Sequence, residues 1–177
     1  MKMKKSLISE YYKLFNINFG KFFLSLGNKI EVMINIVLPV DFGDKTDQLV
    51  DGAIKFAKQL NGRIYLIHVA PSDIGFAIGD MGFQYFPEVE ANEIREELVQ
   101  LNKIEQRIIG HDIDCEHLLK QGLAKDIILE HAKAKNADYI VMGSHGRSGI
   151  YDVFVGSLTK GITKSSSIPV LVLPIHD

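Results

Sequence analysis

The chain has 177 residues, of which 46% are apolar and 24% charged, and its formal net charge is −2. That is enough material for one domain with a full hydrophobic core and too little for two. The single cysteine, Cys115, excludes an intrachain disulfide and a thiolate metal cluster, which suits a reducing cytoplasm. The mildly acidic balance argues against a duplex nucleic-acid interface, and no apolar run is long enough to predict a transmembrane segment.

Residues 1–32 differ from the rest of the chain, because they combine six lysines and six aromatic residues with only two glutamates. Two interpretations stay open. The segment could be a basic amphipathic stretch that lies on a membrane or a partner, or translation could begin at Met33, which is the interpretation we favour. We therefore expect an N-terminal extension over residues 1–32 and one folded domain over residues 33–177.

From residue 33 onward, short apolar runs alternate with segments of helical periodicity. Residues 33–40 are almost continuously apolar, which predicts a buried strand. Apolar residues at helical spacing predict a helix over 49–60, and a second strand follows over 63–69. Residues 71–87 resemble a long loop with interspersed glycines, typical of a lid, a partner surface or a disordered segment.

The remainder of the chain continues the alternation. The elements predicted there are helices over 88–109, 124–135 and about 153–165, and strands over 114–119, 139–142 and 170–173. Five strands alternating with four helices predict an α/β fold with a single open five-stranded parallel sheet and helices on both faces. Ligands bind to such sheets beyond the carboxyl ends of the strands, where the strand order reverses.

The most informative motif is Gly143-x2-Gly146-x9-Gly156-Ser157, which begins directly after the strand at 139–142. Glycines at such a position can adopt positive φ and let a ligand approach the backbone closely. Ser157 falls in the first turn of the next predicted helix. Its hydroxyl and the nearby backbone N–H groups could cap the helix or hold a phosphate.

Two further polar residues fit the same site. Thr159 could add a second hydroxyl, and Asp41, at the end of the first strand, is a natural acceptor for ribose hydroxyls. The motif could equally form only a tight turn and an ordinary helix cap, so the residues alone leave both interpretations open.

Two common nucleotide motifs are missing. The sequence contains no G-x4-G-K-[ST], which argues against a phosphate-loop NTPase. Asp41-Phe42-Gly43-Asp44 follows the first strand in place of G-x-G-x-x-G, which argues against a dinucleotide-dependent dehydrogenase. We predict no catalytic residue and no set of metal-ligating side chains.

Several motifs resemble the universal stress protein family, over roughly residues 33–175. They are Val40-Asp41, His68-Val69, Met142-Gly143-Ser144-His145-Gly146-Arg147, Gly156-Ser157 and Pro169-Val170-Leu171-Val172. The nine-residue spacing between Gly146 and Gly156 is similar to that of the ATP-binding branch of the family. The resemblance implies a Rossmann-like fold of the adenine nucleotide alpha hydrolase type. It also implies a cytoplasmic homodimer that pairs through the last strand, Val170, Leu171, Val172 and Leu173.

By position, the resemblance implies that Asp41 contacts the ribose and that Val69 meets adenine through its backbone. The full predicted site is Val40, Asp41, Val69, Met142, Gly143, His145, Gly146, Arg147, Gly156, Ser157, Leu158 and Thr159. The implied ligand is ATP, or ADP or AMP, with Mg²⁺ or Mn²⁺ as an optional ion on the outer phosphate oxygens. The implied function is nucleotide-dependent regulation of a stress response, with a slow ATPase or another adenine-nucleotide-processing enzyme as the alternative.

Some residues are ambiguous or less informative. His145 and Arg147 could reach a terminal phosphate or could be exposed loop residues. His68 is expected to be a packed, hydrogen-bonded histidine rather than a base, and Cys115 to be a small buried residue in a strand. The acidic residues Glu93, Glu96 and Glu97 are expected on the solvated face of a helix. The family often has Gly-Ser directly after the first-strand aspartate, and this chain departs from it with Phe42-Gly43.

Overall fold

The structure is a computed structural model that describes residues 33–73, 75–79, 82–144 and 156–175. The chain divides into two compact units, residues 1–32 and residues 33–177, and all described residues belong to the second unit. The predicted N-terminal extension therefore lies outside the described residues. Within the described part of the chain, no helix is long and apolar enough to cross a membrane.

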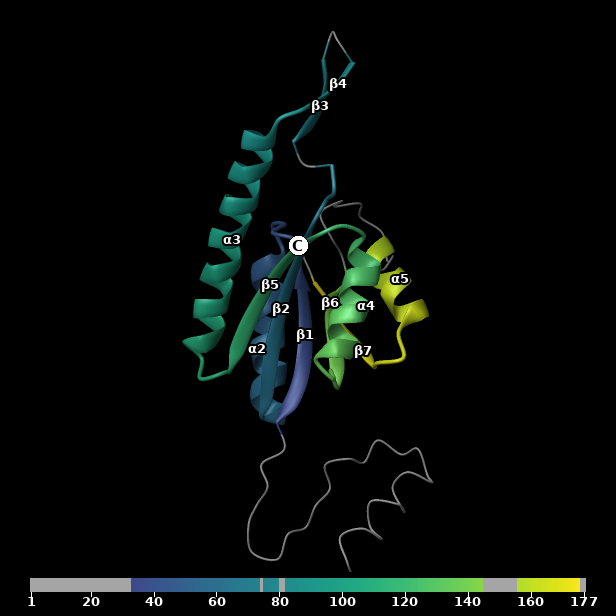
Figure 1. The fold of residues 1–177 in the computed structure, drawn as a ribbon. Helices are drawn as coiled ribbons and strands as arrows, with labels where there is room; N and C mark the ends of the chain where they lie inside the picture. Colours follow the sequence, from purple (N-terminus) through teal and green to yellow (C-terminus); the bar gives the residue numbers. More distant parts are fainter. Residues whose placement is uncertain (1–32, 74, 80–81, 145–155, 176–177) are drawn as a thin grey trace, which may run out of the picture. The chain divides into compact units, whose positions relative to one another are not determined.

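The second unit is built on a five-stranded parallel sheet in the order β5-β2-β1-β6-β7 (Figure 1). Its strands are β1 (Ile34–Val40), β2 (Gly62–Ala70), β5 (Cys115–Gln121), β6 (Tyr139–Gly143) and β7 (Val170–Leu173). Its helices are α2 (Thr46–Leu60), α3 (Pro87–Ile109), α4 (Ala124–Ala134) and α5 (Ser157–Ser165). This architecture confirms the predicted fold class. The chain runs outward from β1 to β2 and β5 and then returns to β6 on the other side of β1, so the strand order reverses between β1 and β6.

Helices cover both faces of the sheet, with α2 and α3 on one side and α4 and α5 on the other (Figure 1). Successive side chains of β1 alternate between the two faces, as strand geometry requires. Ile36 and Leu38 pack into the core cluster that includes residues of α2 and α3, whereas Val37 packs into the cluster with Ile128 of α4 and Ile162 of α5. Burial on both faces explains why the strand sequences are apolar runs rather than alternating ones.

The predicted long loop over residues 71–87 is wrong in part. The structure forms an antiparallel hairpin there from β3 (Phe76–Gly79) and β4 (Gly82–Tyr85). The register pairs Phe76 with Tyr85 and Gly79 with Gly82, so the glycines that suggested irregular backbone lie at the inner ends of the two strands.

The predicted start of the fourth helix near residue 153 is also wrong. Gly156 has φ −51° and ψ 150°, which are extended values, so the helix begins at Ser157. This places the helix N-terminus directly opposite the carboxyl end of β6, to which Gly156 is tied by its N–H donating to the Ser144 carbonyl at 3.0 Å.

Candidate functional site

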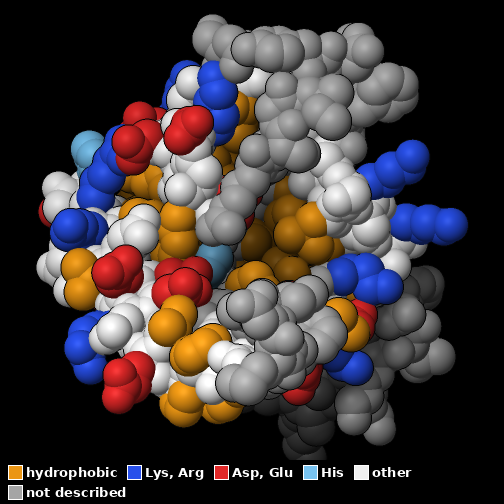
Figure 2. Space-filling view, turned by 90° about the horizontal axis from the view of Figure 1, so that it is seen from above, with side chains coloured by type: hydrophobic (Ala, Val, Ile, Leu, Met, Phe, Trp, Pro, Cys, Tyr) orange, Lys and Arg blue, Asp and Glu red, His pale blue; other side chains and the backbone are white. Residues whose placement is uncertain are grey.

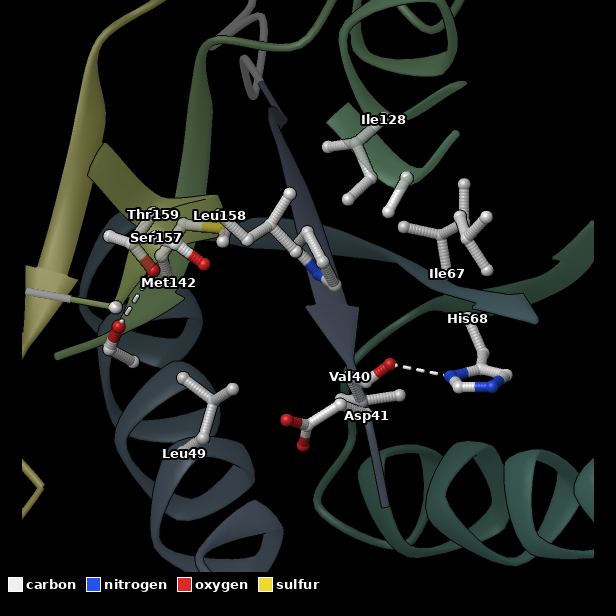
Figure 3. A pocket seen from close by; sticks show the side chains of 15 residues that line it. Val40, Asp41, Leu49, Ile67, His68, Ile128, Met142, Ser157, Leu158 and Thr159 are labelled. Carbon is white, nitrogen blue, oxygen red and sulfur yellow. Dashed lines mark hydrogen bonds between the residues drawn. The ribbon is translucent and has the colours of Figure 1, made fainter. Parts of the chain in front are cut away.

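A pocket of about 270 Å³ lies at the carboxyl ends of β1, β2 and β6, where the strand order reverses (Figure 3). Its lining residues are Pro39, Val40, Asp41, Leu49, Ile67, His68, Val69, Ala124, Ile128, Met142, Gly143, Gly156, Ser157, Leu158 and Thr159. Figure 2 looks onto this end of the sheet and shows hydrophobic side chains near the centre of the face, with Lys and Arg toward its periphery. A pocket at this position is where an open α/β sheet holds a ligand.

Asp41 supplies a carboxylate at one side of the pocket, in the first position after β1. Its Oδ1 accepts a hydrogen bond from the Gly43 N–H at 3.1 Å, a local turn that fixes the direction of the carboxyl group. Between the two residues, Phe42 has a positive φ of 57°. In Figure 3 the Asp41 carboxylate points away from the His68 ring and toward the side on which Leu49 lies.

A second part of the pocket is formed by the end of β6 and the start of α5. The Gly143-Ser144 backbone is fixed there by several hydrogen bonds: the Thr159 hydroxyl donates to the Gly143 carbonyl at 3.0 Å, and the Ser144 N–H donates to the Leu173 carbonyl at 2.9 Å. The Ser144 hydroxyl accepts from the Ile175 N–H at 3.0 Å. These bonds hold the carboxyl end of β6 against both α5 and β7.

The N-terminus of α5 opens into the pocket. In an α-helix the first N–H groups have no intrahelical acceptor, and here they belong to Ser157, Leu158 and Thr159. The N-cap residue Gly156 has no side chain with which to cap the helix, and the first turn carries no acidic residue. N–H groups that have no acceptor within the helix and the positive end of the helix dipole together favour an anionic group at this position.

Much of the remaining pocket lining is apolar. Ile67 and Ile128 are almost fully buried and Met142 is 5% exposed, so they present preformed hydrophobic walls. A flat apolar group fits such walls, while a carboxylate and the N–H groups of a helix N-terminus fit a sugar hydroxyl and a phosphate.

Every predicted site residue that the structure describes lines this pocket. They are Val40, Asp41, Val69, Met142, Gly143, Gly156, Ser157, Leu158 and Thr159. His145, Gly146 and Arg147 lie outside the described residues. Of the two roles open to Ser157, that of the N-cap residue belongs to Gly156 instead, and phosphate binding stays a prediction. The Thr159 hydroxyl donates to the Gly143 carbonyl.

The predicted site did not include six residues that line the pocket, Pro39, Leu49, Ile67, His68, Ala124 and Ile128. It also did not include Glu97, which contacts His68. Glu97 was expected on the solvated face of its helix, but its side chain is only 16% exposed and its Oε1 lies 3.3 Å from His68 Nε2. A signal was available in the sequence, because Glu97 is three residues after Ile94 and four before Leu101, in the stripe of α3 that faces the sheet. The prediction that His68 is packed and hydrogen-bonded is confirmed, since it is 3% exposed and its Nδ1 lies 2.7 Å from the Val40 carbonyl.

Metal-ligating side chains do not gather in the described part of the chain, where no three His, Cys, Asp or Glu residues are grouped so that they could hold an ion. Fold and pocket together define a class: a doubly wound α/β protein with a preformed ligand pocket at the switch point of its sheet.

Comparison with known proteins narrows this class to one family. The model of the universal stress protein family matches residues 33–174. Universal stress protein MJ0531 of Methanocaldococcus jannaschii is 30% identical over 141 residues, which are 78% of this chain and 80% of that protein. The chain therefore belongs to the universal stress protein family.

Solved structures agree with this assignment at the level of the fold. The structure of MJ0577 from Methanocaldococcus jannaschii superposes with a TM-score of 0.64 at 24% identity and covers 82% of this chain and 99% of that one. The universal stress protein of Archaeoglobus fulgidus in complex with dAMP gives a TM-score of 0.54 at 20% identity, with 80% of this chain and 98% of that one covered.

Proposed function

We propose that this chain binds an adenine nucleotide, ATP or its products ADP and AMP, and that it acts as a nucleotide-dependent regulator. The observation that carries the proposal is that apolar side chains, the Asp41 carboxylate and the N-terminus of α5 line one pocket. The dAMP held by the Archaeoglobus fulgidus relative supports an adenine nucleotide as the ligand.

Each part of a nucleotide has a partner in this arrangement. The apolar walls accept the base, the Asp41 carboxylate accepts hydrogen bonds from ribose hydroxyls, and the N–H groups of Ser157, Leu158 and Thr159 donate to phosphate oxygens. A divalent cation, Mg²⁺ or Mn²⁺, would be held by the outer phosphate oxygens rather than by side chains, because the described residues form no metal-ligand set. Such an ion would neutralise phosphate charge.

Substitution at Gly156 tests the proposed site. Its φ and ψ are open to any L-residue, so Gly156→Leu adds bulk to the pocket lining without backbone strain. We expect this variant to fold normally and to lose ATP binding in isothermal titration calorimetry. Gly161→Ala is the matched control on the same helix, since a Cβ there meets only Lys125 Cδ at 3.6 Å and should leave affinity unchanged. Unchanged ATP affinity in Gly156→Leu would refute the site.

Turnover distinguishes a regulator from the alternative, a slow ATPase. We propose binding without efficient hydrolysis, since positioning of phosphates by a helix N-terminus supplies no base for an attacking water. Incubation of purified protein with excess ATP should yield at most about one equivalent of ADP per chain. Product that accumulates over many cycles would favour the enzyme.

We also propose that the chain forms a homodimer through β7. This strand is at the edge of the sheet, and all four of its residues are only partly buried, so its unpaired backbone edge and its side chains suit pairing with a second copy. Sedimentation at micromolar concentration should give the mass of a dimer, and a monomeric mass would contradict this.

A further inference from the structure

A chain of contacts leads from the buried side of α3 to the corner that carries Asp41. His68 lies in its middle, at the end of β2, with its Nδ1 2.7 Å from the Val40 carbonyl and its Nε2 3.3 Å from Glu97 Oε1. Both His68 and Glu97 are largely buried, with side chains that are 4% and 16% exposed. Burial of two such polar groups side by side costs free energy unless they satisfy one another.

The partners of the ring nitrogens determine where its protons lie. A carbonyl oxygen only accepts hydrogen bonds, so Nδ1 carries a proton and donates it to Val40. Nε2 faces the Glu97 carboxylate, with Oε1 3.3 Å away. Among the described residues, Nε2 has no hydrogen-bond partner apart from this ion-pair contact, and Glu97 Oε2 has none. The ring is therefore held from both ends by specific polar partners.

The next contact in the chain is with Phe42. Its ring packs on the His68 imidazole with centroids 4.2 Å apart and planes inclined by 38°. Phe42 also has φ 57°, in the left-handed region that is unfavourable for a bulky L-residue. Such a conformation persists only where surrounding contacts hold it, and the fixed imidazole provides that support.

The conformation of Phe42 in turn sets the direction of the Asp41 carboxyl group. A left-handed residue reverses the chain sharply, and this reversal brings the Gly43 N–H back to Asp41 Oδ1 at 3.1 Å. Asp41 is thereby turned toward the pocket, away from the His68 ring (Figure 3).

We propose that Glu97, His68 and Phe42 are positioning residues that orient Asp41 toward the ribose hydroxyls of the bound nucleotide. The inference rests on the proposed function, because it concerns the affinity of that same pocket. Glu97 and Phe42 act through other residues and touch no ligand themselves. Their effect is therefore confined to what Asp41 recognises, the 2′- and 3′-hydroxyls.

The test compares the affinity for ATP with that for 2′,3′-dideoxy-ATP, which lacks both hydroxyls. A hydrogen bond to a charged group contributes about 1.5–3 kcal/mol, so the wild-type chain should prefer ATP by about 10- to 100-fold. Asp41→Asn shows how far the preference for ATP over dideoxy-ATP falls when the carboxylate itself is lost. We expect Glu97→Ala and Phe42→Ala to lower the preference at least fivefold toward that of Asp41→Asn while the affinity for dideoxy-ATP changes less than twofold.

Two further variants separate positioning from general loss of packing. Glu97→Gln should restore most of the preference, because its amide can donate to His68 Nε2. Glu96→Ala, an exposed neighbour on α3, should leave both affinities unchanged. A preference that stays at the wild-type value in Glu97→Ala, or equal weakening of both nucleotides, would overturn the inference.

A measurement without nucleotide keeps this inference distinct from the proposed function. The Gly43 amide reports its hydrogen bond to Asp41, so its NMR signal should shift in Glu97→Ala and stay in place in Glu96→Ala. If the wild-type chain binds neither nucleotide, the proposed function fails, and the Gly43 signal alone decides the coupling: a shift in Glu97→Ala supports it, and no shift overturns it.

Discussion

Replacement of Thr159 by valine tests whether its hydroxyl stabilises the fold or binds the ligand. Thr159 is 5% exposed, and its Oγ1 donates to the Gly143 carbonyl at 3.0 Å, across sixteen positions of sequence. Because this proton is used within the protein, we expect the hydroxyl to stabilise the junction of β6 and α5 and not to donate to a phosphate. Valine keeps the branched shape and removes only the hydroxyl function.

The expected loss of stability in Thr159→Val follows from the burial of the Thr159 hydroxyl and of the Gly143 carbonyl that accepts its hydrogen bond. A typical hydrogen bond contributes about 1 kcal/mol, and an acceptor left unsatisfied in the interior adds to the loss, so we expect Thr159→Val to lower the free energy of unfolding by about 1–2 kcal/mol. For a domain of about this size, each kcal/mol lowers the melting temperature by about 2–4 °C. The affinity for ATP should stay within about twofold of wild type, which is less than 0.5 kcal/mol.

Urea unfolding and calorimetric titration of the same samples measure both quantities. Thr163→Val is the matched control, because the Thr163 hydroxyl donates at 2.7 Å to the Thr159 carbonyl, which also accepts an ordinary helical hydrogen bond. Thr163→Val should lower the free energy of unfolding by less than about 0.5 kcal/mol. If Thr159→Val unfolds at the wild-type urea concentration and binds ATP tenfold more weakly, the hydroxyl acts on the ligand and the reasoning is refuted.

Two titratable groups outside the pocket give further predictions. Burial, followed by the charge of Glu105, raises the pKa of Cys115 to about 12. The native thiol should therefore react with Ellman's reagent at pH 8 only after the chain unfolds. Rapid reaction of the folded chain would contradict this. Since the unfolded thiol ionises near pH 8.5, the contribution of Cys115 to stability should be lost between about pH 8.5 and about 12. Burial, followed by the charge of Lys135, lowers the pKa of His131 in the folded chain. As the pH falls, His131 is therefore protonated in the unfolded chain before it is protonated in the folded one. The free energy of unfolding should fall as the pH drops below about 6.5. In His131→Gln the loss of urea stability between pH 7.5 and pH 5.5 should be smaller than in wild type, and an equal loss would show that other groups cause it.

The sheet and its switch point were predictable from the sequence because their signals are local. A strand buried on both faces is an apolar run bounded by polar residues, and β1 and β6 are recognisable in this way. The order of strands and helices then restricts the topology through the right-handed crossover rule. The glycine motif predicted the place of the pocket, because Gly143 ends β6 and Gly156 directly precedes α5, and both residues line the pocket.

The hairpin of β3 and β4 was missed for a different reason. Its strands are only four residues each, and glycines occupy their inner ends, at Gly79 and Gly82. A glycine in so short a strand indicates a turn as readily as a strand end. The hairpin forms only because the two strands pair with each other, and the sequence of either strand alone does not show that pairing.

The corner at Asp41 shows most clearly what the sequence could not provide. Because Asp41 is an aspartate at the end of a strand, its carboxylate could be predicted to lie at the pocket. Phe42 stands where the family often has glycine, and it gave no indication of how the chain would turn there. Glycine reaches a positive φ without steric cost, and phenylalanine needs an external support to do so. Phe42 packs on His68 and against the core cluster, and His68 contacts Glu97 from a helix that begins nearly fifty residues after Asp41. Phe42 and the distant Glu97 both contact His68, and neither contact could be predicted from the sequence around Asp41.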